Sequence, residues 1–523
     1  MGSPEGQLRR EGSAEERGAE IFWQACHKGV RLWLDHGKLH YSGPSGALSQ
    51  EEIARLKTCR SQIIAFLQVD QESSPSSGEV RSQRARAPLT LVQLQHWNVF
   101  QLYDRPSMRR TASVTRLQGR LDLRALRQSL AAVVRRHDAL RSRIILSDAV
   151  PLQEISDPGP VELQVIDVAP APEPLRDVEI QHRIDEVMLQ PIDVASDPLF
   201  SVTLLRLEET EHLLVLATDH IISDARSVSI FLRDLLFGYA HVSSGRAISW
   251  SEEVCSFADY ARRQCSALPT RLEVHGRYWS EHLMAGRLRF PPDRERGDPR
   301  PGWGRVTFHI DKDVKAMLRA WCRLRHTTLV MSIFTACAAA VLRWCNTSSG
   351  VIQYLWEGRT TRQEENAIGD FASTLYLRME LTERCSFLEL LDQAMEEYYN
   401  AHEHADFSYI ESRSPRPEVA RSVSFNWIPA AEAGIELAEL TDSEYALRCA
   451  PVPWEDPTLA DLERDQEPMI EFRDSDTDVL CHLSFPQDRF TTATMERFGH
   501  HILRLISTML ENPSGRVRDV VLP

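Results

Sequence analysis

The stretch "ATDHIISDARS" (residues 217–227) follows directly on the apolar run "HLLVL". It contains four side chains that can carry chemistry, namely Asp219, His220, Asp224 and Ser227. The apolar run alternates so that leucine and valine side chains face both sides of a strand, which predicts a strand buried inside a sheet. Polar groups at the end of such a strand are held rigidly while the following loop leaves them accessible, which is typical of catalytic sites.

A histidine at this place fits acid/base chemistry. Its unperturbed pKa lies near neutrality, so His220 can take a proton from an amine or hydroxyl nucleophile. Asp224, four residues on, can fix the loop through a salt bridge rather than touch a substrate. A buried structural histidine between two solvated aspartates would give the same pattern, so the spacing alone leaves both interpretations open.

The sequence shows no competing nucleophile or nucleotide motif. It has no G-x-S-x-G elbow, no G-x-x-x-x-G-K-[ST] loop and no G-x-G-x-x-G loop. His402 and His404 lie close together but lack the H-E-x-x-H spacing, and we interpret them as surface residues. No pair of cysteine or histidine residues has the spacing of a zinc site, so we expect no metal.

Composition limits the class of protein. The chain has 523 residues, 42% of them hydrophobic and 26% charged, which is typical of a soluble globular protein of about three domains. A net charge of −15 argues against binding to nucleic acid. The longest apolar stretch, residues 329–342, is shorter than a membrane span and predicts a buried helix. Ten cysteines without a C-x-x-C pair indicate reduced thiols in a cytoplasmic protein.

The first 88 residues divide into three parts. Residues 1–14 are a predicted disordered tail, and residues 69–88, rich in serine and charge, are a predicted flexible linker. Between them, residues 15–68 show a helical pattern, then alternation around "DHG" (35–37), then a second helix that opens with a capping box. This order predicts a small appended module of helix, hairpin and helix.

From residue 89 onward, helical and strand patterns alternate. A connection rich in proline, glycine and charge at 291–304 divides this region into two halves of similar content, residues 89–290 and 291–523. The fold class is therefore mixed α/β with two lobes of similar size.

Several ordered segments of residues 89–523 resemble the condensation-domain superfamily of non-ribosomal peptide synthetases. These segments are "LTLVQLQHW" with Gln93 and Trp97, "RRHDALRSRI" (135–144), "DHIISDA", "RYW" (277–279), "IGDFASTLYLR" (368–378), "VSFNWIP" (423–429) and "SFPQDRF". The resemblance implies two chloramphenicol-acetyltransferase-like lobes in a V-shaped pseudodimer, with the site between them. It also implies a substrate delivered on the 4'-phosphopantetheine arm of a carrier protein, and no covalently bound cofactor.

The same resemblance assigns roles to single residues. His220 matches the catalytic histidine of the family's HHxxxDG motif, and Asp224 matches the motif aspartate, which usually forms a structural salt bridge to an arginine. Arg359 in "EGRTTR" is the expected partner, because it follows the strand "VIQYLW" as the family's arginine does. Two letters depart from the motif: Asp219 replaces the first histidine, and Ala225 replaces the glycine and could perturb the backbone near the thioester.

A rival activity arises from the same letters. "DHIISDARS" also satisfies the DxxxxDxxS signature of heterocyclization relatives through Asp219, Asp224 and Ser227. "RHDALR", "FNWIP" and the presence of His220 favour condensation. A degenerate domain that only recruits partners is the alternative outside catalysis.

Residues 15–68 resemble the β-hairpin docking domains, of the TubC type, at the N-termini of such synthetase subunits. We expect the C-terminal acidic tail of an upstream acyl or peptidyl carrier protein to add to this hairpin as a strand. The candidate docking residues are Arg31, Trp33, Lys38 and His40.

The sequence therefore predicts an acyltransferase that moves an acyl or peptidyl chain from a carrier thioester to an amine or hydroxyl. Such a reaction forms an amide or an ester in natural-product (antibiotic, polyketide or peptide) biosynthesis. The acceptor is a second carrier protein or a soluble small-molecule nucleophile. Because the sequence ends where the condensation fold ends, release of the finished chain is a further expectation.

Overall fold

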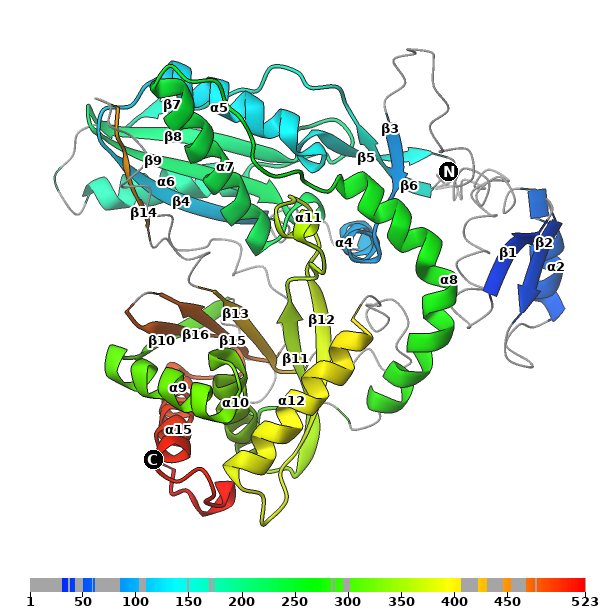
Figure 1. Cartoon of the computed structure of the whole chain (residues 1–523), viewed down its shortest axis with the longest axis vertical. Coiled ribbons are helices and arrows are strands. Elements are labelled where there is room, and N and C mark those ends of the chain that lie inside the picture. The colour runs from blue at the N-terminus through cyan, green and yellow to red at the C-terminus, as the bar shows by residue number, and fades with distance from the viewer. Residues whose placement is uncertain are drawn as a thin grey trace, which may run out of the picture.

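The computed structural model forms two lobes with a small hairpin unit beside the first lobe (Figure 1). It describes residues 31–35, 38–42, 50–58, 60–61, 85–102, 110–147, 150–168, 172, 175–283, 286, 288–294, 302–405, 422–429, 445–452, 467–475 and 477–522. The predicted tail at 1–14 and the first helix of the predicted appended module lie outside the described residues.

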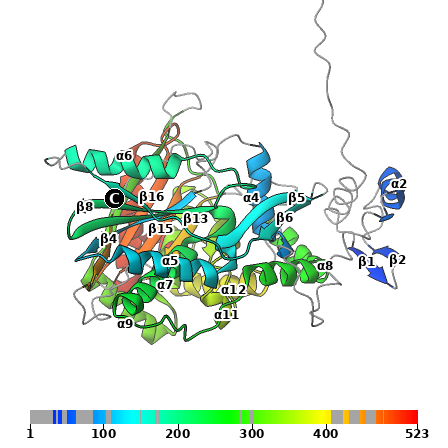
Figure 2. The ribbon, with the colours of Figure 1, turned by 90° about the horizontal axis from the view of Figure 1, so that it is seen from above.

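The first lobe is built on a five-stranded sheet in the order β14-β4-β9-β8-β7. Its strands and helices are β4 (Arg110–Gln118), α5 (Leu123–Arg136), β7 (Gln164–Asp167), α6 (Leu175–Leu189), β8 (Phe200–Glu208), β9 (Glu211–Asp219), α7 (Ala225–Ser243) and β14 (Arg448–Pro451). Helices α5 and α7 pack side by side on one face of the sheet, and α6 covers the other (Figure 2).

Strand β9 confirms the prediction of a strand buried on both faces. Leu214 and Leu216 lie in the core beneath α5 and α7. Leu213 and Val215 lie in the separate core beneath α6. Antiparallel pairing with β4 on one edge and β8 on the other fixes the register of β9 and therefore the place at which the motif after Asp219 leaves the sheet.

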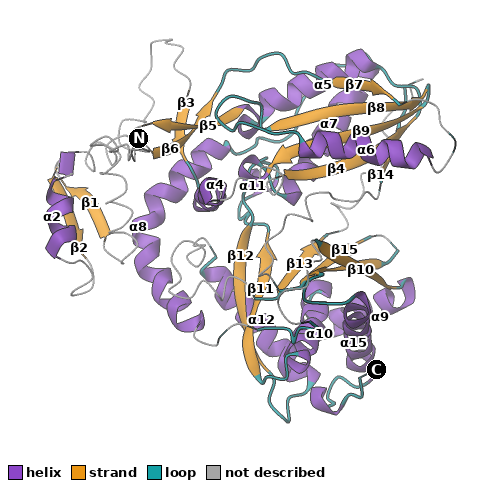
Figure 3. Cartoon of the chain, turned by 180° about the vertical axis from the view of Figure 1, so that it is seen from behind, coloured by secondary structure: helices purple, strands orange, loops and turns teal. Residues whose placement is uncertain are grey.

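The second lobe is built on a six-stranded sheet in the order β10-β16-β15-β13-β11-β12. Its elements are β10 (Trp303–Ile310), α9 (Lys312–Arg325), α10 (Leu329–Trp344), β11 (Ser349–Trp356), β12 (Ser373–Glu380), α12 (Phe387–Glu403), β13 (Ser424–Ile428), β15 (Met469–Asp474), β16 (Val479–Pro486), α15 (Thr492–Glu511) and the 3-10 helix η7 (Val517–Asp519). Helix α10 contacts α9, α12 and α15, and its buried side chains confirm the predicted buried helix (Figure 3).

Two segments cross between the lobes. Helix α8 (Phe257–His282) begins in the core of the first lobe with Phe257, whereas Trp279 lies in the core of the second lobe. Strand β14, which follows β13 in the sequence, pairs antiparallel with β4 in the sheet of the first lobe. The structure thus differs from the simple division at residue 290, because a hydrophobic pattern does not show which sheet an edge strand will join.

A third, smaller sheet lies against α8 in the order β3-β6-β5. Its strands are β3 (Ala85–Pro88), β5 (Ser142–Ser147) and β6 (Val150–Ile155); the 3-10 helix η2 (Asp138–Arg141) precedes β5, and α4 (Leu91–Leu102) follows β3. The predicted linker 69–88 therefore differs from the structure at its last four residues. Backbone pairing with β6 orders this segment, although its sequence "ARAP" lacks any strand periodicity.

The N-terminal hairpin follows the sequence pattern. β1 (Arg31–Asp35) and β2 (Lys38–Ser42) pair antiparallel, with Trp33 opposite His40 and Asp35 opposite Lys38. Helix α2 (Gln50–Thr58) follows the hairpin. The predicted hairpin and the helix after it are confirmed in the part of the chain that is described.

No single helix among the described residues is long and apolar enough to cross a membrane. The pair Lys312–Arg325 and Leu329–Trp344 passes the same test of length and composition together, with a bend of 102° between the two helices.

Candidate functional site

The site begins where β9 ends. The 3-10 helix η3 (His220–Ile222) follows directly, and Asp219 caps it: Asp219 Oδ1 accepts a hydrogen bond from the Ile221 amide at 3.0 Å. Asp219 is buried, and its own amide donates to Leu199 O at 2.7 Å. Asp219, which stands where the family motif has its first histidine, therefore stabilises the turn that holds His220.

Asp224 caps the next helix, α7. Its Oδ1 accepts hydrogen bonds from the Ser227 amide at 2.8 Å and the Ser227 hydroxyl at 2.7 Å. Ala225 is the exposed first residue of α7 and is not among the described residues with positive φ. A methyl group at this position needs no strained backbone, so Ala225 does not disturb the turn as the sequence analysis allowed.

Arg359 reaches Asp224 from the loop after β11. Its two terminal nitrogens lie 2.8 Å from Asp224 Oδ2 and 3.1 Å from Asp224 Oδ1, which is a bidentate ion pair. Gly358, just before it, lets this loop pass close to the backbone of Phe371: its φ is +70°, and a Cβ there would lie 1.7 Å from the Phe371 carbonyl oxygen. The expected pair of Asp224 and Arg359 is thus in contact, with both side chains almost completely buried.

The rest of the Arg359 guanidinium is also bonded. It donates to the carbonyl oxygens of Glu364 and Ala367, each at 3.0 Å, on either side of the end of helix α11 (Arg362–Glu365). Its carbon lies 4.4 Å from the centre of the Phe371 ring. Phe371 in turn donates its amide to Asp224 Oδ2 at 3.1 Å. The ion pair therefore ties the 359–371 segment of the second lobe to α7 of the first.

Ser227 is buried in the same network. Its Oγ lies 2.8 Å from the Gly369 carbonyl oxygen and accepts from the Gly369 amide at 3.1 Å. Asp219 and Ser227 are the two letters that could indicate heterocyclization, and each is 1% exposed and bonded to backbone. His220, by contrast, keeps 37% of its side chain exposed. In this structure His220 is the motif residue that combines chemical reactivity with access.

Two residues that the sequence analysis did not select complete the site. Asp370 Oδ1 lies 3.7 Å from His220 Nδ1, and Asp370 Oδ2 lies 3.2 Å from His96 Nε2. The rings of His96 and His220 stack with centres 4.8 Å apart and planes 27° apart. The side chain of Asp370 has no exposed surface. One buried carboxylate thus contacts a nitrogen of each of two stacked imidazoles.

The carboxylate changes the acid–base behaviour of His220. Burial alone would lower the pKa of His220, but the contact with Asp370 outweighs burial and raises that pKa to about 9. Burial would likewise raise the pKa of Asp370, but His220 and His96 hold it below its ordinary value. At neutral pH the pair is therefore an imidazolium beside a carboxylate.

Helix α4 is held against the motif by Gln93. This fully buried side chain donates from Nε2 to the Ile221 carbonyl oxygen at 2.7 Å. The bond fixes α4 against η3, which brings His96, one turn further along α4, over the ring of His220. His96 and Asp370 both stand inside segments that carried the family resemblance, but sequence spacing gave no sign that they meet.

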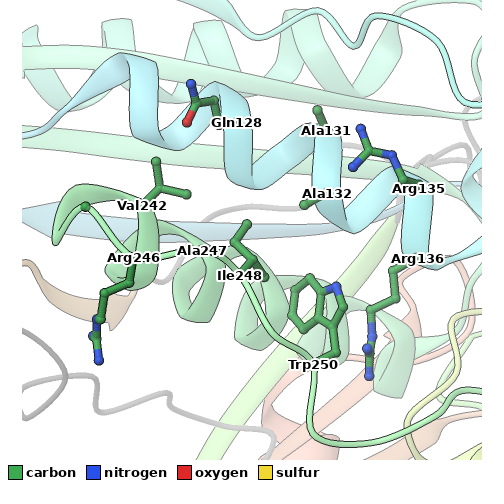
Figure 4. Close-up of a pocket in the computed structure, with 11 residues that line it drawn as sticks. Gln128, Ala131, Ala132, Arg135, Arg136, Val242, Arg246, Ala247, Ile248 and Trp250 are labelled. Atoms are coloured by element: carbon green, nitrogen blue, oxygen red, sulfur yellow. The ribbon is translucent and has the colours of Figure 1, made fainter.

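A cavity of about 880 Å³ lies elsewhere in the first lobe, between α5 and the segment after α7 (Figure 4). Its charged lining residues are Arg135, Arg136 and Arg246. Arg136 lies 4.4 Å from the Trp250 ring and pairs with Asp234 at 3.1 Å, so its charge is already compensated. None of the predicted site residues lines this cavity.

The candidate docking residues all lie on the hairpin. The backbones of Arg31 and Trp33 belong to β1, and those of Lys38 and His40 to β2. His40 is exposed, whereas the side chains of the other three are outside the described residues. Their part in partner binding stays a prediction.

Comparison with protein families gives two matches. Residues 83–523 match the family model described as "Condensation domain". Residues 19–68 match the model described as "TubC N-terminal docking domain". The two matches together cover the hairpin unit and both lobes.

Among curated proteins, the chain is 28% identical over 441 residues to the chondramide synthase cmdD of Chondromyces crocatus, covering 83% of this chain and 11% of that protein. It is 26% identical over 520 residues to surfactin synthase subunit 2 of Bacillus subtilis, covering 95% of this chain and 13% of that protein. The chain thus spans about a tenth of the length of these relatives.

Among solved structures, the X-domain from teicoplanin biosynthesis is similar with a TM-score of 0.68 and 24% identity, covering 86% of this chain and all of that one. This similarity confirms the predicted fold of two chloramphenicol-acetyltransferase-like lobes.

Proposed function

Since the chain belongs to the condensation domain family, we propose that it transfers an acyl or peptidyl chain from the phosphopantetheine thioester of a carrier protein to an amine or hydroxyl acceptor. The new C–N or C–O bond replaces the C–S bond, and the carrier thiol leaves. The observation that carries this proposal is the placement of His220: it lies at the end of a buried strand, half-exposed, on a loop fastened by the buried pair of Asp224 and Arg359.

The charge of the ring indicates how His220 acts. An imidazolium beside the thioester donates a hydrogen bond to the oxygen that becomes negative when the nucleophile attacks. The proton lost by the nucleophile then passes to the leaving thiolate. A general-base role would need the neutral ring, which at pH 7 is about one molecule in a hundred for a pKa of about 9.

We assign Asp224 and Arg359 a bracing role. Neither side chain has surface left for a substrate, and their bonds join α7 to the 359–371 segment. Asp219 and Ser227 support the same loop through backbone bonds. This distribution of roles supports condensation over heterocyclization.

The hairpin unit is the candidate binding site for a partner protein. We propose that the acidic C-terminal tail of an upstream carrier protein binds along β1 or β2, with Arg31, Trp33, Lys38 and His40 as contacts. The acceptor is a second carrier protein or a soluble nucleophile, and the reaction takes place in the cytoplasm.

The test uses the full chain and a carrier protein loaded with an acyl-phosphopantetheine. Amine, hydroxyl and cysteinyl acceptors are offered, and products are weighed by mass spectrometry for the wild type and for His220→Ala. We expect an undehydrated adduct whose rate falls about 10²–10⁴-fold in the variant. A dehydrated product from the cysteinyl acceptor would indicate heterocyclization, and a product independent of His220, or none, would indicate a docking scaffold.

The pH profile of the same assay separates the two roles of His220. A charged hydrogen-bond donor gives a rate that holds at neutral pH and falls as pH rises through about 9. A general base gives a rate that climbs tenfold per pH unit up to about 9. We expect the first profile.

A further inference from the structure

Asp370 differs from ordinary buried carboxylates in its partners. Neither of its oxygens has a hydrogen bond of good geometry among the described residues. Within that same part of the chain, its ion pairs are those with His96 and His220, and no arginine or lysine pairs with it. A buried carboxylate without a compensating cation is strongly unfavourable. Because the two histidines hold the pKa of Asp370 below its ordinary value, the carboxylate is ionised, and one of the two imidazoles carries the compensating charge.

The geometry points to His220 as that cation. Its Nδ1 is buried and faces Asp370 Oδ1, while 37% of its side chain is exposed. The exposed surface therefore belongs to the opposite part of the ring, which includes Nε2. The other titratable groups near the ring are His96, stacked on its face, and Asp224, which is paired with Arg359.

A metal ion held by the same three side chains is the alternative. Their ligand-type atoms lie within 4.8 Å of one another. However, the two rings are nearly parallel, and they face different oxygens of the carboxylate. Ligands of one ion direct their lone pairs at one point, whereas here each ring nitrogen lies nearest to a different oxygen of one carboxylate, which is the arrangement of two ion pairs.

We propose that Asp370 is a positioning residue for the reaction centre: shared between His96 and His220, it holds His220 by Nδ1 as an imidazolium with Nε2 directed to the substrate. The inference rests on the proposed function for its catalytic meaning. The pairing itself is a property of the resting protein and can be measured without substrate.

The experiment is an NMR titration of the full chain labelled at the histidine rings, with the His220 signal assigned by its loss in His220→Asn. The wild-type midpoint is expected at about 9. In Asp370→Asn, which keeps the shape of the side chain, it should fall by two units or more, because burial then acts without the carboxylate. A wild-type midpoint near 6.5, or one that Asp370→Asn leaves in place, would overturn the proposal.

A second variant keeps the test decisive if Asp370→Asn does not fold. His96→Gln removes the competing imidazole and leaves the carboxylate to His220, so the His220 midpoint should stay or rise. A fall toward 6.5 in this variant would contradict the assignment. Zinc bound by the wild type in equilibrium dialysis and lost in His96→Gln would also overturn it, because the cluster would then be a metal site.

A matched control comes from a second buried aspartate–histidine pair in the first lobe. Asp234 Oδ2 lies 3.0 Å from His137 Nε2, and Asp234→Asn should leave the His220 midpoint unchanged. In the transfer assay, Asp370→Asn should lower kcat with little change in the KM for the loaded carrier, and Asp370→Glu should restore part of kcat. Absence of transfer in the wild type, with the midpoint shift intact, would count against the proposed function and not against the pairing.

Discussion

Asp224 and Asp370 are two buried aspartates that both raise the pKa of His220, and they are compensated in opposite ways. Asp224 accepts from the Arg359 guanidinium at both oxygens and from the Ser227 amide and hydroxyl. Asp370 faces only imidazoles and has no hydrogen bond of good geometry in the described part of the chain. Both oxygens of Asp224 are therefore fully hydrogen-bonded, whereas, among the described residues, the charge of Asp370 is balanced by histidine alone.

The difference follows from the permanence of the two cations. A guanidinium does not lose its proton in proteins, so Asp224 is paired with a permanent cation. An imidazole can lose its proton, so the Asp370 pair can change charge during a reaction. One aspartate therefore fixes the loop and the other tunes the ring that the loop carries.

The largest expected effect comes from removing the permanent cation. Arg359→Ala leaves Asp224 buried without its partner and should reduce the free energy of unfolding by about 3–5 kcal/mol. Denaturant unfolding followed by circular dichroism measures this loss. Transfer activity should fall with it, because the loop that carries His220 loses its anchor in the second lobe.

Arg362→Ala is the matched control for this change. Arg362 lies three residues along the chain and pairs with Glu252 at 2.6 Å, but 83% of its side chain is exposed. Exposed ion pairs contribute little, so its unfolding midpoint should stay close to that of the wild type. Equal losses in the two variants would mean that burial of the Asp224 pair has no energetic importance.

The pair of Asp224 and Arg359 could be predicted from the sequence. Hydrophobic alternation identified β9, and the motif letters indicated both Asp224 and its partner Arg359. Strand β14 could not be assigned to its sheet in this way, because four residues with no periodicity join an edge by backbone bonds alone.

Asp370 and His96 could not be predicted, for a different physical reason. Each lies in a segment whose pattern was recognised, but a contact between a helix of the first lobe and a loop of the second depends on how the lobes close. Gln93 fixes one of these elements and Gly369 the other, through bonds to Ile221 and Ser227. Only the assembled structure shows that both bonds converge on His220.

A smaller effect is expected from the hydroxyl that joins the two halves of the site. Ser227→Ala keeps the α7 cap, because the Asp224 carboxylate still accepts from the amide of residue 227. It leaves the Gly369 amide without its buried acceptor, which should cost about 1–3 kcal/mol in the free energy of unfolding.

The products of Ser227→Ala also bear on the choice between the two activities. Loss of stability with an unchanged, undehydrated product is expected if Ser227 only braces the loop. Loss of a dehydrated product at unchanged stability would move Ser227 into the chemistry of cyclization. Both readouts come from one protein preparation, by denaturation and by mass spectrometry.

The smallest expected effect is a pH dependence of the free energy of unfolding that comes from the Asp370–His220 pair. A histidine whose pKa is raised from about 6.5 in the unfolded chain to about 9 stabilises the fold fully below pH 6.5, and this contribution is lost as pH rises through 9. The stability advantage of the wild type over Asp370→Asn should therefore be largest near pH 6 and shrink toward pH 9.

Asp234→Asn is the control. Its difference in stability from the wild type should not shrink between pH 6 and pH 9, because Asp234 is also paired with Arg136 and Arg233, and burial lowers the pKa of its partner His137. Denaturant unfolding of the three proteins at pH 6, 7, 8 and 9 measures the trend. Parallel curves for wild type and Asp370→Asn would mean that Asp370, like Asp224, contributes no pH-dependent stability in this range.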